Sequence, residues 1–251
     1  MFLHPRSTHR PFHFGPFPLE ALPRDERVLQ QEADRPQRAA VQDASQAGDG
    51  LTRALAHYRD LFARFAAGTP AKGKASVPDD LARRSIDLKG AGYFMDASGV
   101  SICRIPANAW LRDTARHDHA FAVVLLVEHP RRPERDNLAF AWTSSAVGKA
   151  AELRAAEIAA CLAEYVRHMG FSARAHIAGD ALLDVDRLAV LSGLAVRHGT
   201  AIQHPYLGDA FSLAAVSTDY ALTADLPLEV GARNVKGLSY WWGINGARSG
   251  R

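Results

Sequence analysis

The sequence predicts an α/β fold, because segments with the pattern of strands alternate with segments that have the period of helices. The clearest strand covers 119–128, and its unbroken apolar run indicates that both of its faces are buried. The clearest helix covers 149–168, which is rich in alanine, has an apolar face and is followed by Gly170 as a C-terminal stop. These segments together indicate an α/β (α+β sandwich) fold around a buried sheet.

The first 25 residues form an arm that is rich in proline and phenylalanine. Its four prolines after residue 10 exclude a continuous helix. Phe12, Phe14 and Phe17 would bury much apolar area against a partner surface, so we expect an extended strap. The polar residues 26–50 that follow indicate a loop or a weak helix.

Apolar residues then recur at steps of three and four from 51 to 65, which predicts an amphipathic helix that stops at Gly68 and Pro70. A linker over 68–78 is expected next, followed by a short helix around 79–90 that continues over 87–95 after a break at Gly90 and Gly92. A strand is expected at 100–105. After the central helix we expect a strand at 171–177, a helix at 182–191, and strands at 200–203 and 211–217.

The chain is expected to have three parts: an arm and polar linker over 1–50, an α/β domain over 51–230 and an aromatic tail over 231–251. The tail contains Tyr240, Trp241 and Trp242 in a row. Exposed aromatic clusters usually find a partner. We therefore expect the arm and the tail to be contact elements.

Composition excludes several classes of protein. The net charge is +3 with scattered basic residues, which indicates a solvated surface and neither nucleic-acid nor anionic-lipid binding. No stretch approaches the roughly 18 apolar residues of a membrane span, and the N-terminus lacks an apolar signal core. We therefore expect a cytoplasmic protein with no membrane partner.

The two cysteines, Cys103 and Cys161, lie far apart in apolar surroundings and are expected to be buried as small hydrophobic residues. They also limit the redox chemistry, because a cubane iron–sulfur cluster needs about four thiolates. The sequence therefore predicts no iron–sulfur cluster in this chain.

A series of short motifs follows the predicted central helix. In order they are Arg167-His-Met-Gly-Phe-Ser-Ala-Arg174, Leu191-Ser-Gly-Leu194, Gly199-Thr200, Val216-Ser-Thr-Asp219 and Leu226-Pro-Leu228. Their order and spacing resemble the reductive dehalogenase family and, more distantly, epoxyqueuosine reductase. The arm from Arg10 to Asp25 also resembles the start of the long, non-exported members, so the resemblance covers about residues 10–230.

The resemblance implies a nitroreductase-like fold that holds cobalamin, with electrons supplied by a module that carries two iron–sulfur clusters. It also implies reductive removal of halide from halogenated organic compounds, with a tyrosine as the proton donor. The positions that it suggests for cofactor binding are Gly193, Leu194, His204, Ser217 and Thr218.

The sequence departs from the family at three points. The position of the proton-donating tyrosine falls near Glu152, which is either an acid or a surface residue favoured by the helix dipole. Ala195 stands where the family has a glycine, which hinders close approach of a ligand to the backbone. The cluster cysteines are missing.

Two interpretations remain open. In the first, the chain is a degenerate N-terminal domain that docks to a catalytic domain with cobalamin and iron–sulfur clusters. In the second, it is a corrinoid- or flavin-binding reductase with an external electron donor.

Three further candidates have alternative explanations. His117 and His119 lie on one side of a strand and could bind a metal, but the sequence shows no third ligand nearby, which favours a polar strand entrance. His204 could equally be a loop histidine without a ligand. Ser217 and Thr218 could bind a phosphate or simply form a turn at the end of a strand.

Overall fold

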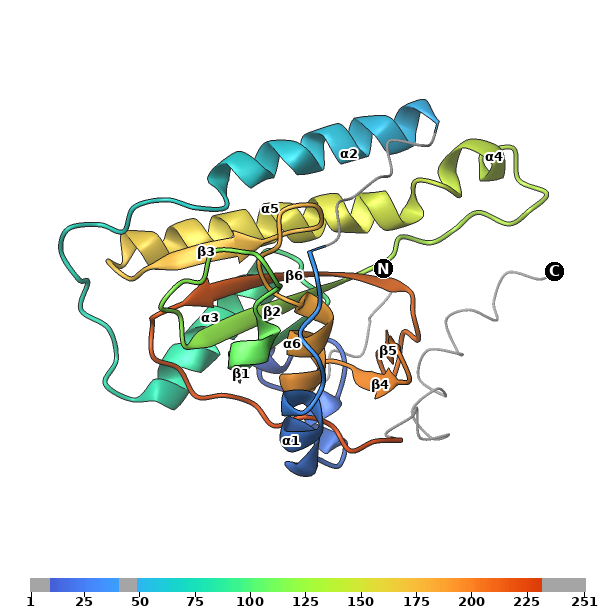
Figure 1. The fold of residues 1–251 in the computed structure, drawn as a ribbon. Coiled ribbons are helices and arrows are strands. Elements are labelled where there is room, and N and C mark those ends of the chain that lie inside the picture. The colour runs from blue at the N-terminus through green and yellow to red at the C-terminus, as the bar shows by residue number, and fades with distance from the viewer. Residues whose placement is uncertain (1–9, 41–48, 232–251) are drawn as a thin grey trace.

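The computed structural model describes residues 10–40 and 49–231, which form a main sheet with helices on both faces and a smaller two-stranded sheet (Figure 1). The helices are α1 (Arg27–Ala33), α2 (Gly50–Phe62), α3 (Leu81–Phe94), α4 (Phe140–Thr143), α5 (Val147–His168) and α6 (Val185–Leu191). The strands are β1 (Gly99–Arg104), β2 (Phe121–Glu128), β3 (Ala173–His176), β4 (Val196–His198), β5 (Ala201–Gln203) and β6 (Phe211–Thr218).

The main sheet has the strand order β1-β2-β6-β3, and all neighbouring strands are antiparallel. Its centre is the pairing of β2 with β6, which runs in register from Phe121↔Thr218 to Glu128↔Phe211. A separate hairpin pairs β4 with β5. The observed fold is α/β, as the sequence predicts.

Alternate residues of β2 enter two different cores, which explains its continuous apolarity. Val123 and Leu125 pack under α5 and α3, whereas Val124 and Leu126 pack under α6. Every residue of β2 except Glu128 is buried. The prediction of a strand buried on both faces is confirmed.

Local capping interactions define where several helices begin and end. Asp49 accepts a hydrogen bond from the Thr52 backbone N–H at 2.9 Å and caps α2, and Asp184 caps α6 in the same way. Gly170 ends α5 with a φ of +83°, and a Cβ there would lie 2.5 Å from the Gly73 carbonyl oxygen. The predicted stop at Gly170 is confirmed.

The predicted break at Gly90 and Gly92 is wrong, because α3 is continuous through both residues. Gly92 does not interrupt the helix and is instead a packing position. A Cβ at this position would lie 2.8 Å from a methyl group of Val100, so the glycine lets α3 approach β1 closely. The sequence prediction also omits the short elements α4 and β4.

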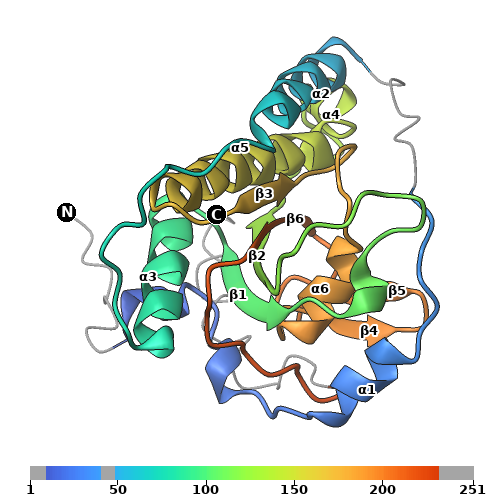
Figure 2. The same cartoon turned by 60° about the vertical axis from the view of Figure 1, so that its left-hand side comes forward.

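The arm follows the surface, and two of its apolar side chains are buried. It contains two single-turn 3-10 helices, at Phe12–Phe14 and Leu19–Ala21, and no α-helix before α1. Phe17 and Leu22 are buried, whereas Phe12 and Phe14 are exposed. Figure 2 shows the arm beside the segment that follows β6, and a bridge between Arg24 and Leu228 joins the two.

Candidate functional site

Gly193, the first suggested cofactor position, lies in the turn after α6 with a φ of +74°. A Cβ there would lie 2.0 Å from Nη1 of Arg24 and 2.5 Å from the Leu226 carbonyl oxygen. Arg24 donates to Leu226 O at 2.6 Å and to Leu19 O at 2.9 Å, and burial lowers its pKa. The space beside the backbone of Gly193, which the missing Cβ leaves open, is therefore occupied by Arg24 of the chain's own arm.

Ser217 lies near the end of β6 and joins two buried histidines. The Leu182 backbone N–H donates to Nδ1 of His176, so the proton of neutral His176 is on Nε2, which lies 2.8 Å from Ser217 Oγ. Ser217 Oγ in turn lies 2.7 Å from Nδ1 of His119. Having accepted from His176, the hydroxyl directs its one hydrogen to His119.

The chain of hydrogen bonds ends at Ser172, whose Oγ lies 2.8 Å from Nε2 of His119. The order of donation is therefore His176, Ser217, His119, Ser172. Burial lowers the pKa of His119 to about 4 and lowers the pKa of fully buried His176 well below its usual value. Both rings are thus neutral at pH 7, as this order requires.

Thr218 and Leu194 also face inward. Thr218 donates its hydroxyl hydrogen to the Ser172 carbonyl oxygen at 2.7 Å and accepts from the Tyr220 backbone N–H at 2.9 Å. Leu194 is buried in the core under α6, and its neighbour Ala195 is equally buried.

His204 lies in the loop after β5 and is buried between aromatic side chains. Its ring centroid lies 5.0 Å from that of Phe17 of the arm and 6.4 Å from that of Phe211. Nδ1 accepts from the backbone N–H groups of Tyr206 and Leu207, which places the proton on Nε2. Within the described residues Nε2 has no hydrogen-bond partner, and burial lowers the pKa of His204 to about 4.

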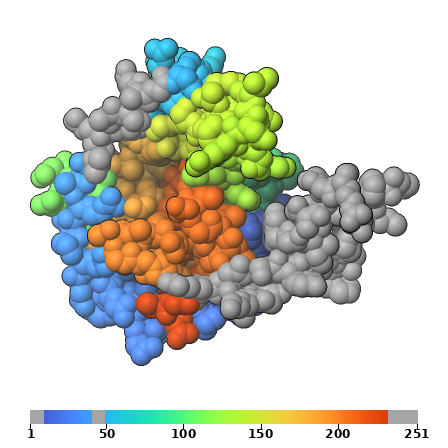
Figure 3. Space-filling view, turned by 90° about the vertical axis from the view of Figure 1, so that its right-hand side faces the viewer, coloured from blue at the N-terminus to red at the C-terminus, as the bar shows by residue number. Residues whose placement is uncertain are grey.

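Glu152 lies in the second turn of α5 and is held by two cations. Arg59 of α2 donates to it at 2.6 Å, and Lys149 donates at 2.9 Å. Glu152 also lines a cavity of about 640 Å³, whose other walls include residues 38–40, residues 177–186 from the loop after β3 to the start of α6, and the start of β6. Figure 3 shows this face recessed between the 129–146 segment in lime green and the 196–212 segment in orange.

The structure does not bring all the predicted site residues together. Ser217 and Thr218 lie at one end of β6, whereas His204 and Glu152 lie near Phe211–Leu213 at the other end. Eight residues of strand separate these ends by about 23 Å. Gly193 and Leu194 lie beneath the sheet, on the side of α6.

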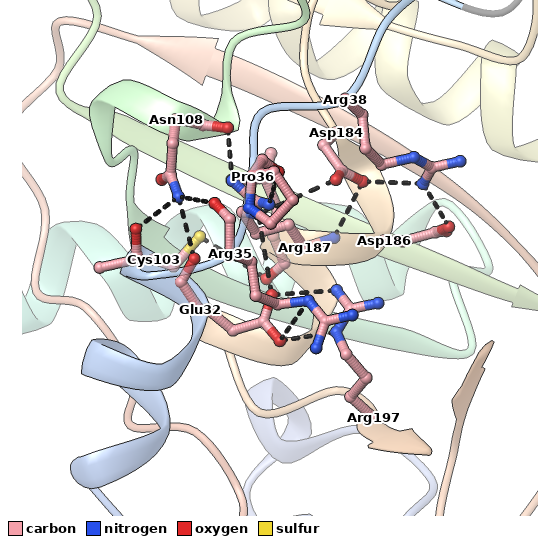
Figure 4. Close-up of polar contacts among 12 residues, drawn as sticks. Glu32, Arg35, Pro36, Arg38, Cys103, Asn108, Asp184, Asp186, Arg187 and Arg197 are labelled. Atoms are coloured by element: carbon pink, nitrogen blue, oxygen red, sulfur yellow. Dashed lines mark hydrogen bonds and ion pairs between the residues drawn. The ribbon is translucent and has the colours of Figure 1, made fainter. Parts of the chain in front are cut away.

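A buried network of ion pairs and hydrogen bonds that sequence reasoning missed attaches α1 and the residues after it to α6, to β4 and to Asn108 (Figure 4). Glu32 of α1 is 3% exposed and accepts from Arg197 at 2.6 and 3.0 Å. Asn108 donates its amide to three carbonyl oxygens at the end of α1, and Arg187 donates to Pro36 O at 2.8 Å. These contacts join segments more than 70 residues apart, so no local pattern reveals them.

The structure places the two cysteines differently and brings the two histidines of the predicted pair together. Cys103 is buried as expected, and burial raises the pKa of its thiol. The prediction that Cys161 is buried is wrong, because it lies on the exposed side of α5. His117 stacks on His119 with ring centroids 5.2 Å apart. Within the described ranges, no group of three or more metal-ligating side chains is close enough to hold an ion.

None of the described helices has the length and apolarity needed to span a bilayer.

The fold and this arrangement define a class, that of α/β proteins with an antiparallel sheet and a docked N-terminal arm. No family model matches the chain, and no curated protein sequence matches it significantly. Among solved structures, a reductive dehalogenase whose structure suggests a mechanism for B12-dependent dehalogenation is 39% identical, with a TM-score of 0.76, over 88% of this chain and 31% of its own.

The catabolic reductive dehalogenase NpRdhA is 38% identical with a TM-score of 0.80, over 96% of this chain and 34% of its own. The complex of NpRdhA with 3-bromo-4-hydroxybenzoic acid gives 38% identity and a TM-score of 0.78. The chain is therefore a reductive dehalogenase-like polypeptide, related to that family over nearly all of its length. It spans about a third of the length of these relatives.

Proposed function

We propose that this chain is a structural domain of a reductive dehalogenase, which docks to a catalytic domain carrying cobalamin and iron–sulfur clusters and does not itself bind cobalamin. Its relatives are 38–39% identical over nearly the whole chain, yet about two thirds of their length has no counterpart here. Halide removal belongs to the longer protein in this proposal, and the chain acts in the cytoplasm, as the sequence suggests.

The observation that carries the proposal is that Gly193, Ser217 and Thr218 are already packed or bonded within the chain. Of the suggested polar side chains, only His204 keeps an N–H, on Nε2, without a partner among the described residues. A nucleotide tail needs free donors and an open backbone. Ser217 and Thr218 each have one hydroxyl hydrogen, given to His119 and to the Ser172 carbonyl. Arg24 lies against Gly193. The residues present therefore do not fit cobalamin at these positions.

The acid at the proton-donor position supports the same conclusion. Glu152 is paired with Arg59 at 2.6 Å and with Lys149 at 2.9 Å, so its carboxylate oxygens already bind cationic side chains of the chain itself. With Cys103 and Cys161 as its only thiols, the chain also lacks the ligands for a cluster that would deliver electrons.

The test is a titration of the purified chain with hydroxocobalamin, followed by absorbance of the corrin bands. We expect no spectral change at micromolar concentrations, and no visible flavin or corrinoid colour after purification. NpRdhA, treated in the same way, is the positive control. A saturable shift of the cobalt spectrum with micromolar affinity in this chain would overturn the proposal.

The sequence suggested two contact elements for docking. In the arm, Phe12 is 62% exposed and its ring centroid lies 6.4 Å from that of Tyr93 of α3. Trp241 and Trp242 lie outside the described residues, so their part in docking stays a prediction. Replacing both tryptophans with serine is expected to reduce co-purification with the catalytic domain, and unchanged co-purification would remove the tail from the proposed interface.

A further inference from the structure

Helix α2 packs on the rest of the molecule through buried polar side chains as well as through half-buried Leu55, Leu61 and Phe62. Thr52 and Arg59, seven residues apart, are both buried on the side facing α5. Thr52 Oγ1 lies 3.0 Å from Ser145 Oγ, and Arg59 donates to Glu152 at 2.6 Å. The inner face of α2 is therefore held by hydrogen bonds and an ion pair together with apolar packing.

Other apolar residues, on the outer side of the same helix and in the turn after it, are exposed to solvent. Leu51 is 38% exposed, Tyr58 is 59% exposed, and Phe65, in the 3-10 turn directly after the helix, is 60% exposed. With exposed Ala54 they form the outer stripe of α2, since seven residues make nearly two helical turns. A surface helix normally buries its apolar residues, and α2 carries this outer apolar stripe in addition to the apolar residues that it packs inward.

Nothing described in the chain covers this stripe. Figures 1 and 2 both show α2 as the outermost layer of the molecule, with α5 between it and the sheet. An apolar stripe on an outermost helix is a typical interaction site. Spacing of three, four and seven residues matches the ridge that a second helix would pack against.

We infer that the outer stripe of α2 is the docking surface for a helix from the part of a dehalogenase polypeptide that has no counterpart in this chain. This inference rests on the proposed function. About two thirds of the length of each relative lies outside the match, so a large body of polypeptide is present in those proteins to cover the stripe. Exposed Arg53 and Arg64 lie along one side of the stripe, where Asp60 is the one exposed acidic residue of the helix, and this excess of positive charge favours a partner helix with acidic residues beside its apolar ridge.

The first experiment places a photo-cross-linking side chain at the stripe. Tyr58→p-benzoylphenylalanine is expressed in cells of the source organism, irradiated, and its cross-linked peptides are identified by mass spectrometry. The matched control is Leu138→p-benzoylphenylalanine, because Leu138 is 95% exposed but precedes α4 on a different segment. We expect position 58 to yield peptides from a polypeptide with iron–sulfur cysteine runs, at least about tenfold above position 138.

Three results would overturn the inference: cross-links from position 58 to a second copy of this chain, equal yields at both positions, or binding of the chain to vesicles of phosphatidylcholine and phosphatidylglycerol that is lost in Tyr58→Ser. The last would assign the stripe to a membrane surface.

The second experiment separates this inference from the proposed function. Tyr58→Ser with Phe65→Ser is expected to reduce co-purification of the catalytic polypeptide by about tenfold or more, while Leu138→Ser leaves it unchanged. Circular dichroism confirms that each variant is folded. If the wild-type chain co-purifies and the double variant does so equally well, the stripe is not the docking surface and the proposed function stands. If the wild-type chain itself does not co-purify, both fail.

Discussion

At the residue scale, the decisive feature is how few donors and acceptors the suggested cofactor positions leave free. A serine hydroxyl has one hydrogen, and that of Ser217 is committed once His176 donates to it. The sequence predicts Ser217 as a polar residue at a strand end but not this use. Its two histidine partners are 41 and 98 residues away along the chain.

Gly193 gives the first prediction at this scale. Gly193→Ala combines an unfavourable positive φ with a collision against Arg24 and the Leu226 carbonyl. Gly199→Ala is the matched control, since Gly199 has a φ of +63° and open space around it. We expect the control to lower the free energy of unfolding by about 1–2 kcal/mol and Gly193→Ala by about 1–3 kcal/mol more. Urea denaturation measures both, and equal losses would show that the arm yields freely at this position.

The buried histidines give a pH prediction. His119 titrates near 6.5 in the unfolded chain, but its pKa is about 4 in the folded protein. Between these values the unfolded state binds more protons, so the free energy of unfolding falls as the pH is lowered from about 6.5 to about 4. One histidine contributes at most about 1.4 kcal/mol per pH unit in this window. His176 and His204, whose pKa values are also lowered, act in the same direction.

Urea midpoints measured across this pH range test the prediction. His119→Gln keeps a side chain able to donate and accept hydrogen bonds but removes the titration, so its stability should depend less steeply on pH. His168→Gln, at a side chain that is 74% exposed, is the control and should keep the wild-type slope. If both variants keep that slope, His119 in the hydrogen-bond chain through Ser217 does not cause the pH dependence of stability.

At the element scale, long elements were predictable and short or long-range features were not. The periods of β2, α2 and α5 are carried by eight or more residues, so their patterns identify them. Helix α4 and strand β4 have four and three residues, too few to show a period. Gly92 misled the prediction because a glycine required for close packing on Val100 looks in the sequence like a helix breaker.

The attachment of α1 gives a prediction for a whole element. Glu32 is the buried carboxylate to which Arg197 donates, so Glu32→Gln would leave cationic side chains without their counter-charge. We expect a loss of about 3 kcal/mol and faster amide hydrogen exchange over residues 27–38. The control is Arg83→Gln, which breaks the exposed pair with Asp87 and should cost about 0.5 kcal/mol or less. Unchanged exchange in α1 would mean that the network does not hold the arm.

At the scale of the whole molecule, the arm and the segment after β6 close the structure together. The Asp25 N–H donates to the Pro227 carbonyl, and the Glu229 N–H donates to the Pro23 carbonyl. Asp225 in the same segment accepts from Lys89 of α3 and from Ser101 of β1. The arm is therefore joined to the α/β domain by backbone pairing as well as by side chains.

This joining leads to the last prediction, that the chain from residue 41 onward does not fold stably without the arm. Phe17, Leu22 and Val28 are each at most 5% exposed, and burying a side chain of this size contributes about 2 kcal/mol. Together they approach the total stability of a typical domain, about 5–15 kcal/mol. Size-exclusion chromatography and thermal melting followed by circular dichroism compare the truncated and complete chains. Phe12→Ser, at a residue 62% exposed, should melt like the wild type, whereas Phe17→Ser should melt at a lower temperature. A truncated chain that melts cooperatively at the wild-type temperature would show that the arm only lies on a domain that is complete without it.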